Sequence, residues 1–345
     1  MVKHEDWYDD KGRLRNFYRV LQISPDAHED VINASYKVLI RINHPDRGGS
    51  HRKATLINTA RDVLVNEKEE YNRLLFNRDG KLIGNYQILE KIGEGGFGAT
   101  YKGKHLLLEE LVCIKHGHQV SAEDEEILLN EAKAIWDIRH HGLPAMRDIM
   151  KLEDDSLALV MSYIPHPTLS QVVKKVEKLE PEHVAWITER CLNVLGYLHY
   201  HGVVHGDIKP GNIMVNPKNH SVVLIDFGLS TIRPKKTSNS LGFTPYFAAP
   251  EQIDNLSPPL YQSDFYSLGM TMIYALNGDD ESALQRKTIP ANTPKPFKLF
   301  IERLIKYDLK NRPEWEKENL VETIGKIRTD AFGRRRSNVM QINGL

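Results

Sequence analysis

The sequence predicts an α+β protein in which an all-helical segment precedes a strand-rich lobe and a larger helical lobe. Residues up to about Phe76 are poor in glycine and show helical periodicity. From Tyr86 the chain changes to short strand-like runs punctuated by glycine, and after Pro181 it becomes mostly helical. Strands followed by helices predict two lobes with a cleft between them.

Composition narrows the class of protein. The 345 residues are 41% hydrophobic and 27% charged, which is ordinary for a globular protein. Lysine plus arginine (46) balances aspartate plus glutamate (46), so nucleic acid is not an expected partner. The two cysteines, Cys113 and Cys191, lack metal-ligand spacing. The N-terminus has no apolar leader and no run is long enough to span a bilayer, so we expect a cytoplasmic protein without a membrane partner.

The first segment predicts a helical hairpin. A helix-start signal stands at residues 24–26, and the first helix should end near Asn43, because His44 precedes Pro45. One apolar stripe on this helix consists of Val31, Ala34, Val38 and Ile42. The second helix covers residues 51–66, with an inward face made of Ala54, Ile57, Ala60, Val63 and Leu64. Antiparallel packing would leave "HPD" exposed at the tip.

A bare "HPD" can be only a proline-stopped turn, but its context is specific. "YRVLQISPDA", "ASYKVL", "NHPDRGGS", "LINTARDVL" and "EKEEYNRLL" together resemble the J domain of DnaJ-type co-chaperones. The resemblance implies docking onto a DnaK-type heat-shock chaperone and stimulation of its ATP hydrolysis. It implies an essential contact through His44, Pro45 and Asp46, with steering by Lys37, Arg41 and Arg47. No glycine–phenylalanine stretch or zinc module follows, so we expect this J domain to be attached to another domain and not to be part of a general DnaJ chaperone.

The strand-rich lobe begins with a glycine-rich hairpin, "GEGGFGATYKG". Its glycines let backbone amides approach phosphates closely, although many such turns are simple hairpins. The candidate phosphate-binding residues are Gly93, Gly95, Gly96 and Gly98, with Phe97 capping the turn. Lys115 follows on a strand, in the register of a lysine that binds α- and β-phosphates. An amphipathic helix predicted over residues 123–141 supplies Glu131 as the partner of Lys115.

The helical lobe supplies the remaining parts for phosphoryl transfer. Asp207, Lys209 and Asn212 lie in "HGDIKPGN", Asp226 lies in "IDFG", and "AAPE" follows. Asn212 and Asp226 offer hard oxygens suited to Mg²⁺. Asp207 can deprotonate the attacking hydroxyl, and Lys209 can stabilise charge on the transferred group. Each piece alone could be an ordinary turn, but their joint order excludes chance assembly.

From about Tyr86 to Arg328 the chain resembles the eukaryotic-type serine/threonine protein kinases. The resemblance implies a bilobal kinase fold and transfer of the γ-phosphoryl group of ATP, with Mg²⁺, to serine or threonine of a protein substrate. The implied adenine site consists of Met161 as gatekeeper, Ser162, Tyr163 and Ile164 as the backbone edge, and Thr100, Cys113 and Met214 as walls. It also implies that Asp264 braces the catalytic loop, that Arg312 pairs with Glu251, and that His205 packs under the "DFG" turn.

These assignments predict a J domain over residues 1–76, a linker over 77–85, a kinase domain over 86–328 and a basic tail over 329–345.

Gly206 departs from the kinase pattern. Related kinases place an arginine here that binds an activation-loop phosphate, which glycine cannot do. The catalytic residues around it are intact, which favours an active kinase that does not need this phosphate. The alternative is a J-domain co-chaperone whose kinase-like module only binds nucleotide.

Overall fold

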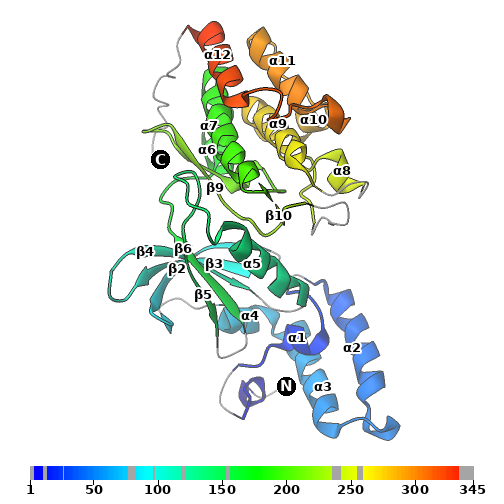
Figure 1. Cartoon of the computed structure of the whole chain (residues 1–345). Helices are drawn as coiled ribbons and strands as arrows, with labels where there is room; N and C mark the ends of the chain where they lie inside the picture. The colour runs from blue at the N-terminus through cyan, green and yellow to red at the C-terminus, as the bar shows by residue number, and fades with distance from the viewer. Residues whose placement is uncertain are drawn as a thin grey trace. The chain divides into compact units, whose positions relative to one another are not determined.

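The computed structural model describes residues 4–10, 14–25, 27–76, 82–95, 98–117, 122–152, 156–234, 242–254 and 259–333. The chain divides into two compact units. The first comprises Met1–Leu129 and Arg147–Tyr163, and the second comprises Asn130–Met146 and Ile164–Leu345. The α+β class predicted from the sequence is confirmed, with N-terminal helices, then a sheet, then a helical region (Figure 1).

The J-domain region of the first unit is helical. Its elements are η1 (His4–Trp7), α1 (Phe17–Leu21), α2 (Glu29–Asn43), η2 (Pro45–Arg47), α3 (His51–Asn66) and α4 (Lys68–Phe76). Helices α2 and α3 run side by side (Figure 1). The predicted bounds of α3 are confirmed, and so is its buried face of Ala54, Ile57, Ala60, Val63 and Leu64.

The apolar stripe predicted on α2 is exposed, which corrects the expected packing. Val38 is 56% exposed and Ile42 is 65% exposed, and Val31 and Ala34 are exposed as well. The residues of α2 that enter the core or pack against it are Ile32, Tyr36, Leu39 and Ile40. Helix α2 therefore carries two apolar stripes. Helix α3 packs against the stripe that contains Ile32, and the predicted stripe through Val38 stays exposed.

The start of α2 also differs from the prediction, whereas its end at Asn43 is confirmed. The backbone N–H of Ala27 donates to the carbonyl of Ser24 at 3.0 Å, ahead of the helix. The helix begins at Glu29, where Nδ1 of His28 accepts the backbone N–H of Asp30 at 3.3 Å. A histidine that follows the start signal thus caps the helix.

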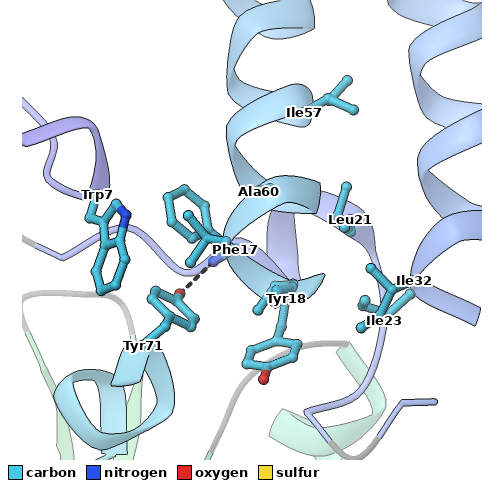
Figure 2. Close-up of a cluster of buried hydrophobic side chains, with 11 residues drawn as sticks. Trp7, Phe17, Tyr18, Leu21, Ile23, Ile32, Ile57, Ala60 and Tyr71 are labelled. Carbon is cyan, nitrogen blue, oxygen red and sulfur yellow. Dashed lines mark hydrogen bonds between the residues drawn. The ribbon is translucent and has the colours of Figure 1, made fainter. Parts of the chain in front are cut away.

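Aromatic side chains dominate the core of this region. Figure 2 shows Trp7, Phe17 and Tyr18 around the ring of Tyr71, and all four are fully buried. The Tyr71 hydroxyl accepts the Phe17 backbone N–H at 2.7 Å and donates to the carbonyl of Arg15 at 2.6 Å. Burial raises the pKa of Tyr71, so the phenol remains a donor. This residue therefore ties the segment before α1 to α4.

The described residues of the first unit also form a six-stranded sheet in the order β1-β2-β3-β4-β6-β5. The strands are β1 (Leu82–Ile83), β2 (Tyr86–Gly95), β3 (Gly98–His105), β4 (Leu111–Gly117), β5 (Met146–Lys151) and β6 (Leu157–Ser162). Strands β2 and β3 pair antiparallel, which confirms the glycine-rich hairpin. Strand β6 is buried from Leu157 to Met161, as its continuous apolar run predicts.

The second unit is mainly helical. Its helices are α6 (Leu169–Val176), α7 (Pro181–Tyr200), α8 (Pro250–Ile253), α9 (Tyr261–Asn277), α10 (Glu281–Arg286), α11 (Lys295–Leu304) and α12 (Leu320–Phe332), with 3-10 turns η3 (Pro210–Asn212) and η4 (Leu309–Asn311). Its short strands are β7 (Val203–Val204), β8 (Ile213–Asn216), β9 (Ser221–Leu224) and β10 (Thr231–Ile232). Helix α9 is buried from Ser263 to Leu276 and contacts both α7 and α11 (Figure 1).

Helix α5 (Ala122–Ile135) crosses from one unit to the other and is shorter than predicted. It ends at Ile135, and the N–H of Ile138 bonds the carbonyl of Ile135 in a turn. Ile138 is buried although it lies outside the helix, which explains why apolar periodicity overestimated the helix length.

Within the part of the chain that the structure describes, no helix is long and apolar enough to cross a membrane.

Candidate active site

One face of the sheet collects residues expected to bind nucleotide. Thr100 pairs with Lys115, and Cys113 pairs with Met161 across neighbouring antiparallel strands. Directly paired residues share a face, and residues two apart on β4 share it too. Thr100, Cys113, Lys115 and Met161 therefore lie on one face, while Ile114 is buried on the other.

The glycine-rich hairpin places Gly93 opposite Thr100 and Gly95 opposite Gly98. Gly96 and Phe97 lie outside the described residues. A Cβ on Gly98 would stand 2.3 Å from the carbonyl oxygen of His116. Gly98 is therefore required by the close approach of β4, in addition to any role at a phosphate.

The expected adenine-binding residues and the Lys115–Glu131 pair are distributed over both units. Ser162 pairs with Val112, and the Lys102 ammonium lies 5.3 Å from the ring of Tyr163 in the first unit. Ile164 and Met214 belong to the second unit, where Met214 pairs with Val223 on β9. Lys115 lies in the first unit, and the 1% exposed Glu131 lies in the second. Their pairing and the joint adenine site stay predictions.

The catalytic loop forms a dense polar network around Asp207, which is 6% exposed. Asp207 Oδ1 accepts the Thr244 hydroxyl at 2.6 Å, and Oδ2 lies 2.7 Å from Lys209 Nζ. Asn212 Nδ2 donates to the same Oδ2 at 3.0 Å and to the Asp207 carbonyl at 2.9 Å. Lys209 Nζ also donates to Thr244 Oγ1 at 3.0 Å. These bonds bring three predicted site residues together and fix the direction of the carboxylate.

Asp264 of α9 holds the backbone of this loop, as the sequence predicts. Its Oδ2 accepts the His205 N–H and its Oδ1 accepts the Gly206 N–H, each at 2.8 Å. The amide of Gln252 donates to the Gly206 carbonyl at 2.8 Å. Gln252 and Thr244 are absent from the predicted site. Thr244 is recognisable in "GFTPYFAAPE", whereas nothing in the sequence pairs Gln252 with a backbone carbonyl.

Gly206 has a steric reason to be glycine. Its φ is +79°, and a Cβ there would stand 2.4 Å from the Leu229 carbonyl oxygen. Glycine adopts this left-handed conformation without strain, unlike residues that carry a Cβ. The chain therefore lacks an arginine at a position where the backbone of Leu229 lies too close for any side chain.

Gly206→Ala is therefore expected to lower the free energy of unfolding by about 2–3 kcal/mol, from backbone strain and the clash. Denaturant unfolding measures this difference. The matched control is Gly211→Ala in the same loop, since no atom lies within 4 Å of the added Cβ. Equal losses in the two variants would contradict the steric argument.

The "DFG" turn packs on the same loop. The His205 ring lies 4.6 Å from the Phe227 ring, which places the histidine under this turn as predicted. Its Nδ1 accepts the Asp207 N–H at 3.3 Å, so its Nε2 donates to the Ile225 carbonyl at 3.2 Å. Burial lowers the pKa of His205, so the neutral ring that these bonds need is favoured.

Asn130 of α5 makes contacts that the sequence does not predict. Its Nδ2 donates to the Ser230 carbonyl at 2.8 Å and to the Gly228 carbonyl at 3.2 Å. Ser230 is 2% exposed, and its hydroxyl donates to the Phe227 carbonyl at 2.7 Å. Helix α5 is thereby tied directly to the "DFG" turn. An asparagine inside a helix carries no pattern that would reveal such a partner.

Asn212 and Asp226 carry side-chain oxygens of the kind that Mg²⁺ binds. Asn212 uses its amide nitrogen on Asp207, so its side-chain carbonyl oxygen is the atom that would face a metal ion. Amide and carboxylate oxygens are hard ligands, and Mg²⁺ in such sites takes few protein ligands together with phosphates. The described residues hold no cluster of three or more His, Cys, Asp or Glu able to bind a metal.

A buried ion pair stabilises the segment after the catalytic loop. Arg312 donates to both oxygens of Glu251, at 2.6 and 2.9 Å, and its side chain is fully buried. Ser263 adds a hydroxyl bond to the same carboxylate at 2.7 Å. The predicted pairing of Arg312 with Glu251 is confirmed.

The "HPD" tripeptide lies just beyond α2. His44 precedes η2, and its Nδ1 accepts the Asp46 N–H at 3.3 Å. The side chains of His44 and Asp46 are 49% and 86% exposed. Lys37 and Arg41 are exposed on α2. The side chain of Arg47 lies outside what the structure describes.

Comparison with curated proteins shows many relatives. A probable serine/threonine-protein kinase of Clostridium perfringens is 28% identical over 274 residues, which cover 73% of this chain and 39% of the relative. Serine/threonine-protein kinase B of Synechocystis is 30% identical over 57% of this chain and 38% of its own length. PrkC of Bacillus subtilis is 30% identical over 62% of this chain and 34% of its own length. The chain thus spans well under half the length of these relatives.

Two family models match separate parts of the chain. Residues 16–72 match the DnaJ domain, in agreement with the helices and the exposed "HPD". Residues 86–322 match the protein kinase domain and include every residue of the catalytic network. The chain therefore belongs to the protein kinase family and carries a DnaJ domain ahead of its kinase domain.

Proposed function

We propose that this chain is an active ATP-dependent serine/threonine protein kinase. The observation that carries the proposal is the network of Asp207, Lys209, Asn212 and Thr244 in the catalytic loop. A module that only bound nucleotide would have no need to orient a carboxylate with this many donors. The relatives named as serine/threonine kinases support the same reaction.

Asp207 would act as the base that accepts the proton of the attacking hydroxyl. Lys209 would neutralise charge on the transferred phosphoryl group. Asn212 and Asp226 would hold Mg²⁺, which supplies charge neutralisation between the phosphates when bound.

The remaining residues would bind and orient ATP. Lys115, held by Glu131, would bind the α- and β-phosphates, and the glycine-rich hairpin would contribute backbone amides. The adenine ring would meet the face that carries Thr100, Cys113 and Met161.

A transfer assay tests this proposal. The full chain is incubated with γ-labelled ATP, Mg²⁺ and a generic basic protein, beside an Asp207→Asn variant. Label on serine or threonine in the wild-type reaction alone supports the kinase. Equal label in both reactions contradicts it and favours the co-chaperone with a nucleotide-binding module. A sample treated with phosphatase should retain the initial rate if Gly206 removes the need for a regulatory phosphate.

We further propose that the J domain docks onto a DnaK-type chaperone and stimulates its ATPase. The exposed His44 and Asp46 at the end of α2 support this, since J domains act through such a tripeptide. Lys37 and Arg41 would steer the approach, next to the exposed Val38 and Ile42 on the same helix. The J domain would occupy residues 1–76, the linker 77–85, the kinase domain 86–328 and the basic tail 329–345.

His44→Gln should lower stimulation of a DnaK-type ATPase at least about tenfold, because a central interface contact is lost. Single-turnover ATP hydrolysis by the chaperone measures the effect. His28→Gln is the matched control, since His28 is also exposed and its Nδ1 also accepts a backbone N–H at 3.3 Å. Absence of stimulation by the wild-type chain would refute the docking itself.

A further inference from the structure

Trp315 lies in the turn before α12 and reaches α7. Its indole Nε1–H donates to Nδ1 of His199 at 2.8 Å. Its ring packs edge-on against Phe265 of α9, with centroids 5.3 Å apart. A Cβ added to Gly196 would lie 3.3 Å from the indole, so α7 leaves room for this ring. The position of Trp315 is therefore well defined.

This bond determines where His199 carries its proton. An indole N–H can only donate, so Nδ1 of His199 must be the acceptor. The proton of the neutral ring then lies on Nε2, which donates to Asp264 Oδ2 at 2.8 Å. A doubly protonated ring would direct an N–H at the indole N–H. The Trp315 contact therefore opposes an imidazolium at His199.

The state of His199 bears on the catalytic loop because Asp264 is shared. The same Oδ2 accepts the His205 backbone N–H, and Oδ1 accepts the Gly206 N–H. Asp264 is fully buried, so its charge has no competing water. A cation at His199 would draw the carboxylate toward itself and weaken both bonds to the loop that precedes Asp207.

We propose that Trp315 is a positioning residue that keeps His199 neutral, so that Asp264 holds the catalytic loop across the pH range in which histidine titrates. The effect on catalysis rests on the proposed kinase activity, whereas the protonation state of His199 does not.

The elements packed against α7 carry further titratable and charged groups. Tyr261 stacks on the ring with centroids 4.6 Å apart and lies on α9, like Asp264. On α12, Arg328 pairs with Glu189, ten residues before His199 on α7. Among the contacts that the described residues make with the His199 ring, Asp264 supplies the charge.

Trp315→Phe tests the proposal because it retains a ring and removes the N–H. The ratio of wild-type to variant kcat should rise about tenfold as the pH falls from about 8 to about 6, where an unperturbed histidine gains its proton. The KM for ATP should change little. In a His199→Gln background, which retains a side-chain donor but cannot titrate, Trp315→Phe should add no pH dependence. A pH-independent ratio in the chain that keeps His199, or the same slope with and without His199→Gln, would refute the proposal.

A second measurement is independent of kinase activity. Imidazole nitrogen NMR shifts of the full chain, assigned through His199→Gln, report which ring nitrogen carries the proton. We expect wild-type His199 to remain protonated on Nε2 alone over this pH range and to become doubly protonated in Trp315→Phe. Identical shifts in the two proteins would overturn the role of Trp315. NMR shifts as expected in a chain without kinase activity would refute only the catalytic consequence.

Discussion

Asp207→Asn is expected to lower kcat for phosphoryl transfer by a factor of about 10² to 10⁴, the usual contribution of a general base. The amide has nearly the shape of the carboxylate. Its oxygen can accept from Lys209 and Asn212, while its nitrogen faces the Thr244 hydroxyl. The network should therefore survive, but the group that accepts the proton is gone. Affinity for ATP and Mg²⁺ should change little.

Single-turnover transfer at saturating ATP, together with nucleotide binding by calorimetry, separates these effects. Thr244→Val is the matched variant, because it removes a hydroxyl bond to the same carboxylate and leaves the base in place. Its loss should be clearly smaller than that of Asp207→Asn. Equal losses would assign Asp207 a structural role, and unchanged transfer by Asp207→Asn would exclude it as the base.

Arg312→Met is expected to lower the free energy of unfolding by about 3–5 kcal/mol. The change leaves the Glu251 carboxylate buried without its cation. It also removes the guanidinium donors from three backbone carbonyls, those of Lys306, Tyr307 and Gln262, which accept at 2.7, 3.0 and 3.0 Å. The loss of packing against the Tyr266 ring, 4.9 Å from the guanidinium, acts in the same direction.

Denaturant unfolding monitored by circular dichroism gives this value. Lys326→Met is the control, since its pair with Glu322 is exposed and its removal should cost no more than about 0.5 kcal/mol. The double variant Glu251→Leu with Arg312→Met should recover part of the loss, because no buried charge then remains. If the double variant is as unstable as the sum of the singles, the penalty does not come from an unpaired charge.

The sequence predicts the fold class and most elements because periodicity and glycine spacing report local structure directly. Helix α2 shows the limit. Its stripes, one through Val38 and the other through Ile32, are both apolar at helical spacing. Which one is buried depends on the packing of α3, and no local pattern encodes that choice. The bend after Ile135 was missed for a related reason, since Ile138 is buried without continuing the helix.

The candidate site likewise contains residues that the sequence predicts and residues that it does not. Asp207, Lys209 and Asn212 could be named from motif order, and the structure brings their side chains together. Residues that act on the backbone were harder to find. Asn130 and Gln252 donate to main-chain carbonyls of segments 98 and 46 residues away in sequence. Such contacts depend on where the chain passes, so only the fold reveals them.

The Thr244 hydroxyl has a further effect on the protein before substrate arrives. It already donates to Asp207 Oδ1, one of the two oxygens that would accept from a substrate hydroxyl in the proposed reaction. Substrate binding would therefore exchange one O–H donor for another. The Asp207 carboxylate would need little reorganisation when the substrate binds. A water molecule that enters the site must compete with the Thr244 hydroxyl for the same oxygen of Asp207. We therefore expect slow hydrolysis of ATP in the absence of a protein acceptor.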